Sequence, residues 1–443
     1  MDLDIKEELI EKEIIYYDKK DNLHISIPKA TEEIMKRQEY LTIRNQKDEI
    51  YVFKEGIWIN NGRQIIEEEI EKLLGELCKN NLVKEISEKV KRLTSINYKD
   101  FDKVDEELIC VKNGVLNLIT GELINPKSDY YFKTKLSINF NKKKHCPKII
   151  NFLNETLYPE DLPVLQEWIG FCLYRKYFIK KAMILVGEKN TGKTILLNLL
   201  TEFIGINNSS GINLQRISQG DKFGLSSLKN KLLNSFDDLS NKDLSDGGGF
   251  KIATGGGYIT AEYKFGESFQ FLNYAKHIFA TNKIPPVADT NDDAYYERWI
   301  PIQLDNQCSK ENQNPFLLKD LTTEEELSGL LNWAIEGLRR LLVNGKFSYN
   351  KKSSEIKYIM ERSSHPLATF VNDVLEQENG NRISKENMFK VYTKYCNDNF
   401  LPRLSKSQLG RQLEKYCYYV IGKGGNERVW ENAEIKEKYR EIL

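Results

Sequence analysis

The spacing of hydrophobic and polar positions changes several times along the chain, and each change predicts a different kind of element. Short aromatic and β-branched runs between Tyr40 and Ile59 are separated by polar turns, which predicts a group of strands. Apolar positions then return every three or four residues from Ile65 to about Leu93 and again from Ile149 to Gly170, which predicts helices. Residues 181–305 alternate short apolar runs with helical segments, a pattern typical of an α/β domain with a largely parallel sheet.

The C-terminal part of the chain has a different pattern. Ser384 and Ser405 each stand where they can cap a helix. The stretch from Tyr418 to Trp430 is typical of a strand, a glycine-rich turn and a second strand. Two helices followed by a hairpin predict a winged-helix module.

Charge supports a nucleic-acid role for this module. The whole chain is neutral, with 65 basic and 65 acidic residues, but Arg382–Arg428 carries ten Lys or Arg residues against four Asp or Glu residues. A local excess of positive charge is the footprint expected of a duplex-DNA reader. We expect DNA contacts from four of its basic residues: Lys406, Arg411, Lys415 and Lys423. The alternative is a winged-helix fold that contacts protein, or a charged face that only meets solvent.

Length and composition are those of a folded protein of several domains. The chain has 443 residues, of which 40% are hydrophobic and 29% charged. We expect an α+β accessory domain at 1–150, an α/β domain at 151–345 and the winged-helix module at 346–443. No window approaches the roughly 18 apolar residues that a membrane span needs, and the acidic start lacks a signal-peptide pattern. The seven scattered cysteines form no C-x-x-C pair, so we expect no membrane, no export and a cytoplasmic location in a host cell.

A phosphate-binding loop is the most specific motif of the chain. The apolar run Ala182–Val186 is followed at once by a stretch that matches G-x-x-x-x-G-K-[ST], and a helix begins at Ile195. The matching residues are Gly187, Glu188, Lys189, Asn190, Thr191, Gly192, Lys193 and Thr194. In such a loop the backbone N–H groups and the helix N-terminus face phosphates. Lys193 is expected to hold the β- and γ-phosphates of ATP, and Thr194 to ligate Mg²⁺. The alternative is a chance match on a glycine turn.

Two further strand ends carry polar groups that such a site needs. Asp237 and Asp238 follow an apolar run, and one carboxylate can hold Mg²⁺ while the other polarises water. We place Asp238 with Thr194 at the metal. Asn282 ends the next strand and is expected to sense the γ-phosphate. For the acids the alternative is a solvated loop, and for Asn282 an ordinary turn before prolines.

Arg298 precedes another predicted strand and is a candidate arginine finger for the nucleotide of a neighbouring subunit. The alternative is a surface ion pair with Asp292, Asp293 or Glu297. Sequence alone leaves both readings open.

Together these motifs resemble the superfamily 3 helicases. The likeness is nearest to the helicase half of phage, plasmid and mobile-element primase-helicases, a group that includes the poxvirus primase-helicase. The phrases that carry it are Gln166–Gly170, Lys231–Asn234 with Asp237–Ser240, Phe250–Lys251 with Thr254–Gly256 and Lys264–Phe265, Ala280–Asn282 and Glu297–Trp299. Asn113–Leu118 and Thr120–Leu123 resemble the accessory domain that precedes the motor in this group. Gly257 and Glu297 depart from the family pattern, which has an acid and often a second Arg there.

The resemblance implies an α/β P-loop motor of the AAA+ type that forms a ring, usually a homo-hexamer, and moves 3′→5′ on single-stranded DNA. It also implies a DNA-contacting hairpin, for which Lys251, Lys264 and Phe265 are the candidates. A cation for phosphates and a ring for base stacking suit a grip on single strands. The alternative for Lys264–Phe265 is an ordinary surface strand.

The function expected from these features is an ATP-dependent replicative DNA helicase of a virus or mobile element. One alternative is an initiator ATPase that binds and melts an origin, and another is a P-loop regulatory ATPase without a DNA role. The region before the motor shows no carboxylate and His arrangement typical of a primase, so priming is expected from a separate primase or polymerase.

Overall fold

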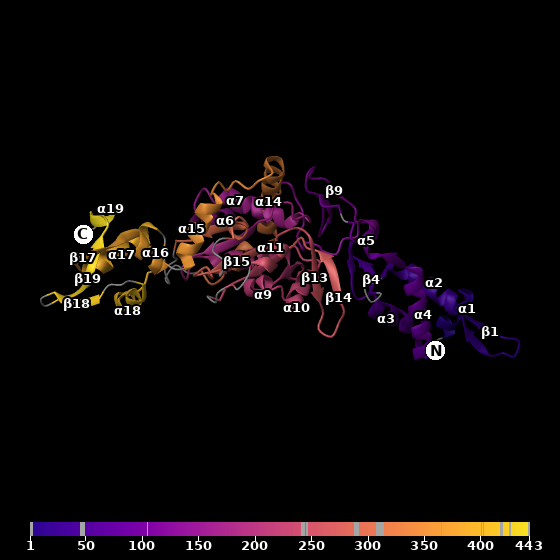
Figure 1. Ribbon diagram of the computed structural model, residues 1–443. Helices are drawn as coiled ribbons and strands as arrows, with labels where there is room; N and C mark the ends of the chain where they lie inside the picture. Colours follow the sequence, from indigo (N-terminus) through magenta and orange to yellow (C-terminus); the bar gives the residue numbers. More distant parts are fainter. Residues whose placement is uncertain are drawn as a thin grey trace. The chain divides into compact units, whose positions relative to one another are not determined.

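The computed structural model describes residues 3–44, 49–103, 105–240, 244, 247–287, 292–306, 314–364, 366–399, 401, 403–416, 420–424 and 427–441. The chain divides into two compact units, Met1–Phe140 and Asn141–Leu443, and each is described by itself (Figure 1). Within the described ranges, no helix combines the length and apolar character needed to cross a bilayer.

The first unit packs helices against a four-stranded sheet. Its helices are α1 (Leu3–Glu11), α2 (Ile27–Arg37), α3 (Gly62–Leu74), α4 (Asn80–Leu93) and the short α5 (Tyr98–Phe101). The sheet has the order β5-β4-β3-β6 and is built from β3 (Tyr40–Arg44), β4 (Glu49–Lys54), β5 (Ile57–Ile59) and β6 (Ser95–Asn97). The strands predicted between Tyr40 and Ile59 are therefore confirmed.

The helical periodicity predicted from Ile65 to about Leu93 is confirmed, and the chain forms two helices there, α3 and α4. α3 ends at Gly75, which has φ +51 and donates its N–H to Glu71 O. A left-handed residue of this kind is typically Gly because it carries no Cβ. Ile66, Ile70 and Leu74 of α3 are buried, so the apolar spacing was correct and only the break was missed.

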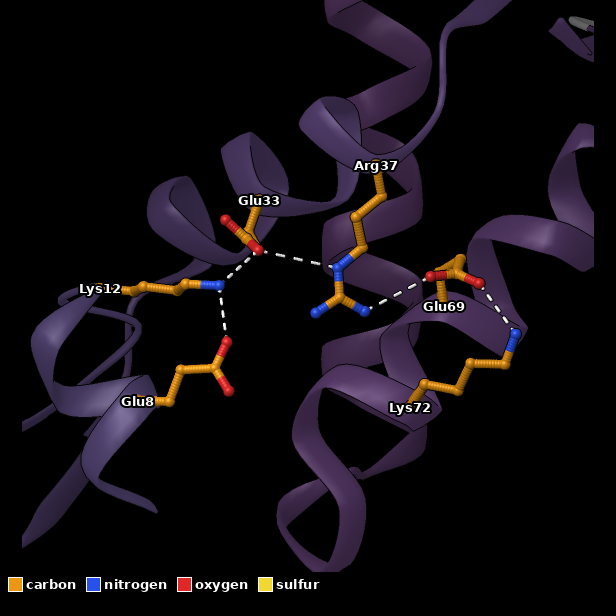
Figure 2. A network of polar contacts seen from close by, with 6 residues as sticks. All are labelled: Glu8, Lys12, Glu33, Arg37, Glu69 and Lys72. Carbon is orange, nitrogen blue, oxygen red and sulfur yellow. Dashed lines mark hydrogen bonds and ion pairs between the residues drawn. The ribbon is translucent and has the colours of Figure 1, made fainter. Parts of the chain in front are cut away.

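A chain of alternating charges joins three helices of this unit (Figure 2). Lys12 on the segment after α1 contacts Glu8 at 2.7 Å and Glu33 of α2 at 2.8 Å. Arg37, also on α2, contacts Glu33 at 3.7 Å and Glu69 of α3 at 3.4 Å, and Glu69 continues to Lys72. Ion pairs with Lys12 and Lys72 lower the pKa of Glu33 and Glu69.

Short strands complete the first unit. β1 (Ile15–Tyr17) and β2 (Leu23–Ile25) form a hairpin, and β7 (Leu108–Val111), β8 (Gly114–Asn117) and β9 (Leu123–Ile124) form a second small sheet. β7 and β8 are antiparallel and pair from Leu108 with Asn117 to Val111 with Gly114.

The second unit contains a five-stranded sheet in which every pair is parallel. Its order is β11-β12-β15-β10-β16. The strands are β10 (Ala182–Val186), β11 (Ser209–Ser210), β12 (Leu233–Phe236), β15 (Lys276–Thr281) and β16 (Trp299–Gln303). Every residue of β10 and β15 is buried, which is what a parallel strand covered on both faces requires. The predicted α/β domain with a largely parallel sheet is confirmed.

Helices and a hairpin surround this sheet. The helices are α6 (Pro147–Thr156), α7 (Leu162–Leu173), α8 (Lys193–Ile204), α9 (Leu214–Ser218), α10 (Lys222–Leu225), α11 (Gly248–Ala253), α12 (Asp293–Tyr296), α13 (Leu317–Leu321), α14 (Glu324–Asn344) and α15 (Ser353–Ser364). The hairpin is β13 (Tyr258–Glu262) with β14 (Ser268–Leu272). The helical stretch predicted from Ile149 to Gly170 forms two helices, because the chain is extended at Leu157.

α14 packs closely along α7 because glycines remove side chains from the contact. A Cβ on Gly170 would lie 2.3 Å from Ala334 O, and one on Gly337 would lie 2.4 Å from Gln166 O. The fully buried Glu167 of α7 accepts hydrogen bonds from Arg340 Nε of α14 at 2.7 Å and from Ser348 N at 2.7 Å. These groups hold the two helices in one register.

The C-terminal segment of the second unit has its own hydrophobic cluster, which includes Phe370, Tyr392 and Trp430. The elements run α16 (Pro366–Val374), β17 (Leu375–Ser384), α17 (Lys385–Asp398), α18 (Lys406–Tyr416), β18 (Val420–Gly424), β19 (Glu427–Ile435) and α19 (Glu437–Arg440), with the sheet order β17-β19-β18. Ser384 and Ser405 cap the two helices as predicted, accepting from Asn387 N and Gln408 N.

Candidate phosphate-binding site

The glycine loop Gly187–Thr194 joins β10 to α8 at the carboxyl edge of the parallel sheet, and its last two residues, Lys193 and Thr194, begin α8. Gly187 is packed so tightly that a Cβ would lie 2.2 Å from Leu304 O. Gly192 has φ +90 and Asn190 has φ +64, so the loop twice enters the left-handed region. The glycines of the motif are therefore needed for the path of the backbone, as the sequence predicts.

Lys193 lies inside this loop. Its side chain is only 7% exposed, and its Nζ donates to Gly187 O and Glu188 O at 2.7 Å each. Burial lowers the pKa of Lys193, while the carboxylates of Asp237 and Glu188 act in the opposite direction. An incoming anion would offer this ammonium group a stronger partner than two carbonyls.

Asp237 is the carboxylate that lies beside the loop. Thr194 Oγ1 donates to Asp237 Oδ2 at 2.6 Å. Asp238 has φ +55, and its N–H donates to Asp237 Oδ1 at 2.8 Å. The sequence paired Thr194 with Asp238, and the structure instead brings Asp237 to Thr194. The role of Asp238 stays a prediction.

These oxygen donors suit Mg²⁺ bound together with phosphate. No group of three or more His, Cys, Asp or Glu residues able to hold a metal occurs in the described part of the chain. Mg²⁺ does not need one, because it keeps several waters and uses one or two protein oxygens plus substrate phosphates. The Thr194 hydroxyl and the Asp237 carboxylate are donors of this kind.

Asn282 follows β15, next to the start of the loop. Val186 pairs with Thr281, and Gly187 N–H donates to Thr281 O at 3.3 Å. The structure therefore brings the loop and Asn282 to the same edge of the sheet, as the sequence predicts.

Arg298 lies elsewhere. It comes directly before β16, whose first residue pairs with Ala182 at the start of β10, so it is at the opposite edge of the sheet from the loop. Its guanidinium donates to Ala294 O through Nη1, and its Nε is buried without a hydrogen-bond partner among the described residues. The structure does not bring Arg298 together with the other predicted catalytic residues of the same chain.

Lys264 and Phe265 lie at the tip of the hairpin formed by β13 and β14 (Figure 1). Phe265 is 95% exposed, and Lys264 Nζ lies 5.2 Å from the centre of its ring. The other face of the hairpin is packed, since Ile259, Ala261 and Phe271 are buried. A packed hairpin that presents a cation and a bare aromatic ring is suited to contacts with bases and phosphates.

Lys251 does not join that tip. It lies on α11 and forms a 2.7 Å ion pair with Asp292, which neutralises its charge within the chain. The pairing was not expected, because the sequence signal for Asp292 is no different from that of any acidic loop residue.

Two predicted DNA contacts of the C-terminal segment lie on α18. Lys406 and Arg411 are exposed there. Lys406 forms an ion pair with Glu386 at 3.3 Å, and Arg411 Nε donates a hydrogen bond to Ser407 O at 3.5 Å. The side chains of Lys415 and Lys423 lie outside the described part of the chain.

Comparison with protein families gives three matches along the chain. The family described as "D5 N terminal like" matches residues 8–158, and the family described as "Poxvirus D5 protein-like" matches residues 362–443. The stretch that holds the glycine loop, residues 185–298, matches a family of unknown function, DUF5906. The chain fits the D5-like primase-helicase group of phages and poxviruses. The fit to this group suggests a viral replication protein, an enzyme of DNA replication and DNA as a partner.

Solved structures of the C-terminal region of NrS-1 also align with the chain. Two apo forms align at 12% and 13% identity with TM-scores of 0.49 and 0.47, and each alignment covers 91% of this chain and 98% of the other. TM-scores of this size do not establish a common fold. No curated protein matches the chain.

Proposed function

We propose that this D5-like protein is an ATP-driven helicase motor of viral or mobile-element DNA replication. The observation that carries the proposal is the Thr194–Asp237 hydrogen bond of 2.6 Å beside the buried Lys193. A loop lysine, a hydroxyl and an acid from a second strand end are the protein groups that a P-loop ATPase supplies.

The sheet order supports an AAA+ motor. β15 lies between the loop strand β10 and the acid strand β12, as expected for that class, and it is followed by the polar Asn282. The C-terminal order α16, β17, α17, α18, β18, β19 with the sheet β17-β19-β18 likewise supports a winged-helix domain.

The residues of the site would divide the work. The loop backbone and Lys193 would hold the phosphates of ATP, and Thr194 and Asp237 would hold Mg²⁺, which would supply positive charge to the phosphates. Asp238 orients the attacking water, and Asn282 contacts the γ-phosphate. Lys264 and Phe265 at the hairpin tip hold single-stranded DNA, and copies of the chain join in a ring, which we expect to be a hexamer.

The direct test is ATP hydrolysis at low salt with and without single-stranded DNA. We expect stimulation by DNA in the wild type and loss of hydrolysis in Lys193→Ala. Phe265→Ala should keep the basal rate and lose the stimulation, because the ring is at the hairpin tip and not at the loop. Unaltered ATP hydrolysis in Lys193→Ala would show that the glycine loop is not the ATPase site. ATPase activity with no DNA binding would favour a regulatory ATPase.

An origin-binding initiator is a second candidate, supported by the positive charge of the C-terminal module. Footprinting of duplex DNA tests it. A footprint on one specific sequence that is lost in Arg411→Ala, with strand separation absent, would favour an initiator over a processive helicase.

A further inference from the structure

The N-terminus of α6 has no cap of its own. Its N-cap position is Cys146, whose side chain makes no capping hydrogen bond, and Pro147 follows. The first N–H groups of a helix need acceptors when they are buried. Here the acceptor comes from far along the chain, because Glu326 of α14 accepts from Lys148 N at 3.3 Å and from Ile149 N at 3.1 Å.

The position of Glu326 in α14 is one from which a Glu side chain ordinarily caps its own helix. Thr323 is the N-cap of α14 and accepts from Glu326 N, and Thr-x-x-Glu is the pattern of a capping box, in which the Glu side chain returns to the N-cap N–H. The structure directs this carboxylate to α6 instead, and Glu326 is only 5% exposed. A buried carboxylate that caps a different helix ties the two helices together.

Two more residues on the same face of α14 strengthen the tie. Gly329 lies so close to the segment before α6 that a Cβ would be 2.1 Å from His145 C. Asn332 Nδ2 donates to Asn141 O and Lys144 O at 2.8 Å each. Glu326, Gly329 and Asn332 therefore hold the start of α6 against α14, and the three helices α6, α7 and α14 lie together in Figure 1.

The other end of α6 forms a wall of the glycine loop. A Cβ on Gly192 would lie 3.0 Å from Thr156 Cγ2 and 3.5 Å from Phe152 Cε2. The segment after α6 is tied to the end of β16, because Tyr158 donates to Asp305 at 2.6 Å and Asn306 donates to Glu155 O at 2.8 Å. α6 thus connects the Glu326 cap with the backbone that carries Lys193.

We propose that Glu326 is a positioning residue for nucleotide binding, which acts through α6 on the glycine loop. This inference rests on the proposed ATPase function. Glu326 touches no part of the loop itself, so its effect is on the population of loop conformations that accept the phosphates, and apparent affinity falls as that population falls.

The test compares Glu326→Gln with Glu325→Gln in the full chain. Gln has the same shape, but its amide offers only one acceptor oxygen to the two N–H groups of α6. Glu325 is its neighbour and pairs with Lys144 at the surface, so it is a matched loss of charge. We expect Glu326→Gln to raise KM for ATP roughly three- to tenfold with kcat within about twofold, the range that loss of a helix cap corresponds to. Glu325→Gln should leave both unchanged, and Glu326→Asp should fall between.

Hydrogen exchange supplies a readout that does not need ATP. Residues 148–156 and 187–194 should exchange faster in Glu326→Gln than in Glu325→Gln. A folded Glu326→Gln chain with wild-type KM and wild-type exchange in the loop would overturn the inference. If that variant does not fold, Glu326→Asp is judged by the same measurements. A wild-type chain that binds no ATP would instead overturn the proposed function, whereas the exchange comparison separately tests whether Glu326 orders the glycine loop.

Discussion

At the scale of single residues, Asp237 and Asp238 are neighbours in the chain but have different surroundings. Asp237 accepts from Thr194, whereas Asp238 follows in the left-handed region and is more exposed. We expect Asp237→Asn to raise the Mg²⁺ concentration for half-maximal hydrolysis by about tenfold or more, because it weakens a metal contact. Asp238→Asn should lower kcat at every Mg²⁺ concentration and leave the midpoint unchanged. A magnesium titration of ATPase activity measures both.

The exposed Glu202 of α8 offers a control for the lost charge, since Glu202→Gln should change neither quantity. If the Mg²⁺ concentration for half-maximal hydrolysis changed in Asp238→Asn and not in Asp237→Asn, Asp238 would be the metal ligand, as predicted from the sequence.

Lys276 gives a prediction about pH. It is fully buried at the start of β15, where Nζ donates to three carbonyls and lies 4.4 Å from the centre of the Phe171 ring. Burial lowers the pKa of Lys276 from 10.5 to about 7. The unfolded chain therefore binds more protons than the folded chain between these pH values. Stability from this residue is complete above pH 10.5 and is lost as the pH falls towards 7.

The measurement is the free energy of unfolding of wild type and Lys276→Met at pH 7, 8 and 9. The difference between the two should change in favour of the wild type as the pH rises, by at most about 1.4 kcal/mol per pH unit. A difference that does not change with pH would mean that Lys276 keeps its ordinary pKa in the fold.

Much of the candidate site could be predicted from the sequence, because the residues of the loop lie close together in the chain. The loop needs its glycines and Lys193 at set spacings within eight residues, so a motif describes it. Two of the three carbonyls that accept from Lys276, and both N–H groups that donate to Glu326, lie about a hundred or more residues away in the chain, and no spacing rule reaches that far. Asp237 rather than Asp238 lies beside Thr194, and the backbone of Asp238 has a positive φ. The sequence contains no signal that predicts this φ.

At the scale of elements, the charge chain of Figure 2 predicts salt-dependent stability. Glu33 of α2 forms ion pairs with both Lys12 and Arg37. Glu33→Gln therefore removes the ion pair that joins the segment after α1 to α2. We expect a lower melting temperature for this variant at low ionic strength, and a smaller difference in 1 M salt because exposed charges are screened. The lowered pKa of Glu33 also means that its contribution is present at neutral pH and is lost as the pH falls below its ordinary value of 4.5.

Thermal melting at two salt concentrations checks this, with Glu67→Gln as the comparison. Glu67 pairs only with the neighbouring, exposed Arg63 on α3 in the contacts seen here. Equal losses for Glu33→Gln and Glu67→Gln would mean that the connections between helices add nothing.

Elements were predicted best where a periodic pattern ran unbroken. The strands after Tyr40 and the capped helices at Ser384 and Ser405 have strong local signals. The helix breaks at Gly75 and Leu157 were missed because apolar spacing continues across them. The backbone leaves helical geometry at Gly75 through a positive φ and at Leu157 through an extended conformation, and neither change alters the apolar spacing.

At the scale of the whole molecule, the parallel sheet separates two sets of predicted catalytic residues. The glycine loop and Asp237 follow the carboxyl ends of their strands, whereas Arg298 precedes β16. β16 has five residues and pairs in parallel with β10, which places Arg298 roughly 16 Å of strand from the loop edge. That separation is longer than an Arg side chain, so a role for Arg298 in hydrolysis requires the site of another copy.

Two inactive variants should therefore restore each other. Lys193→Ala lacks the loop cation and keeps Arg298, and Arg298→Ala lacks the finger and keeps the loop. Each alone should lose about a thousandfold or more of kcat. In the proposed rings, assembled from equal amounts of both variants, about a quarter of the interfaces join an intact loop to an intact Arg298, so the mixture should recover up to that share of wild-type ATPase activity.

The control mixes Lys193→Ala with the double variant Lys193→Ala/Arg298→Ala, so that every loop in the mixture lacks its cation. No interface in that mixture is complete, so no activity should return, although the chains assemble in the same way. Recovery in the first mixture and none in the second would locate the function of Arg298 between subunits. Activity that stays at the sum of the separate variants in both mixtures would mean that Arg298 acts within its own chain, where it donates to Ala294 O.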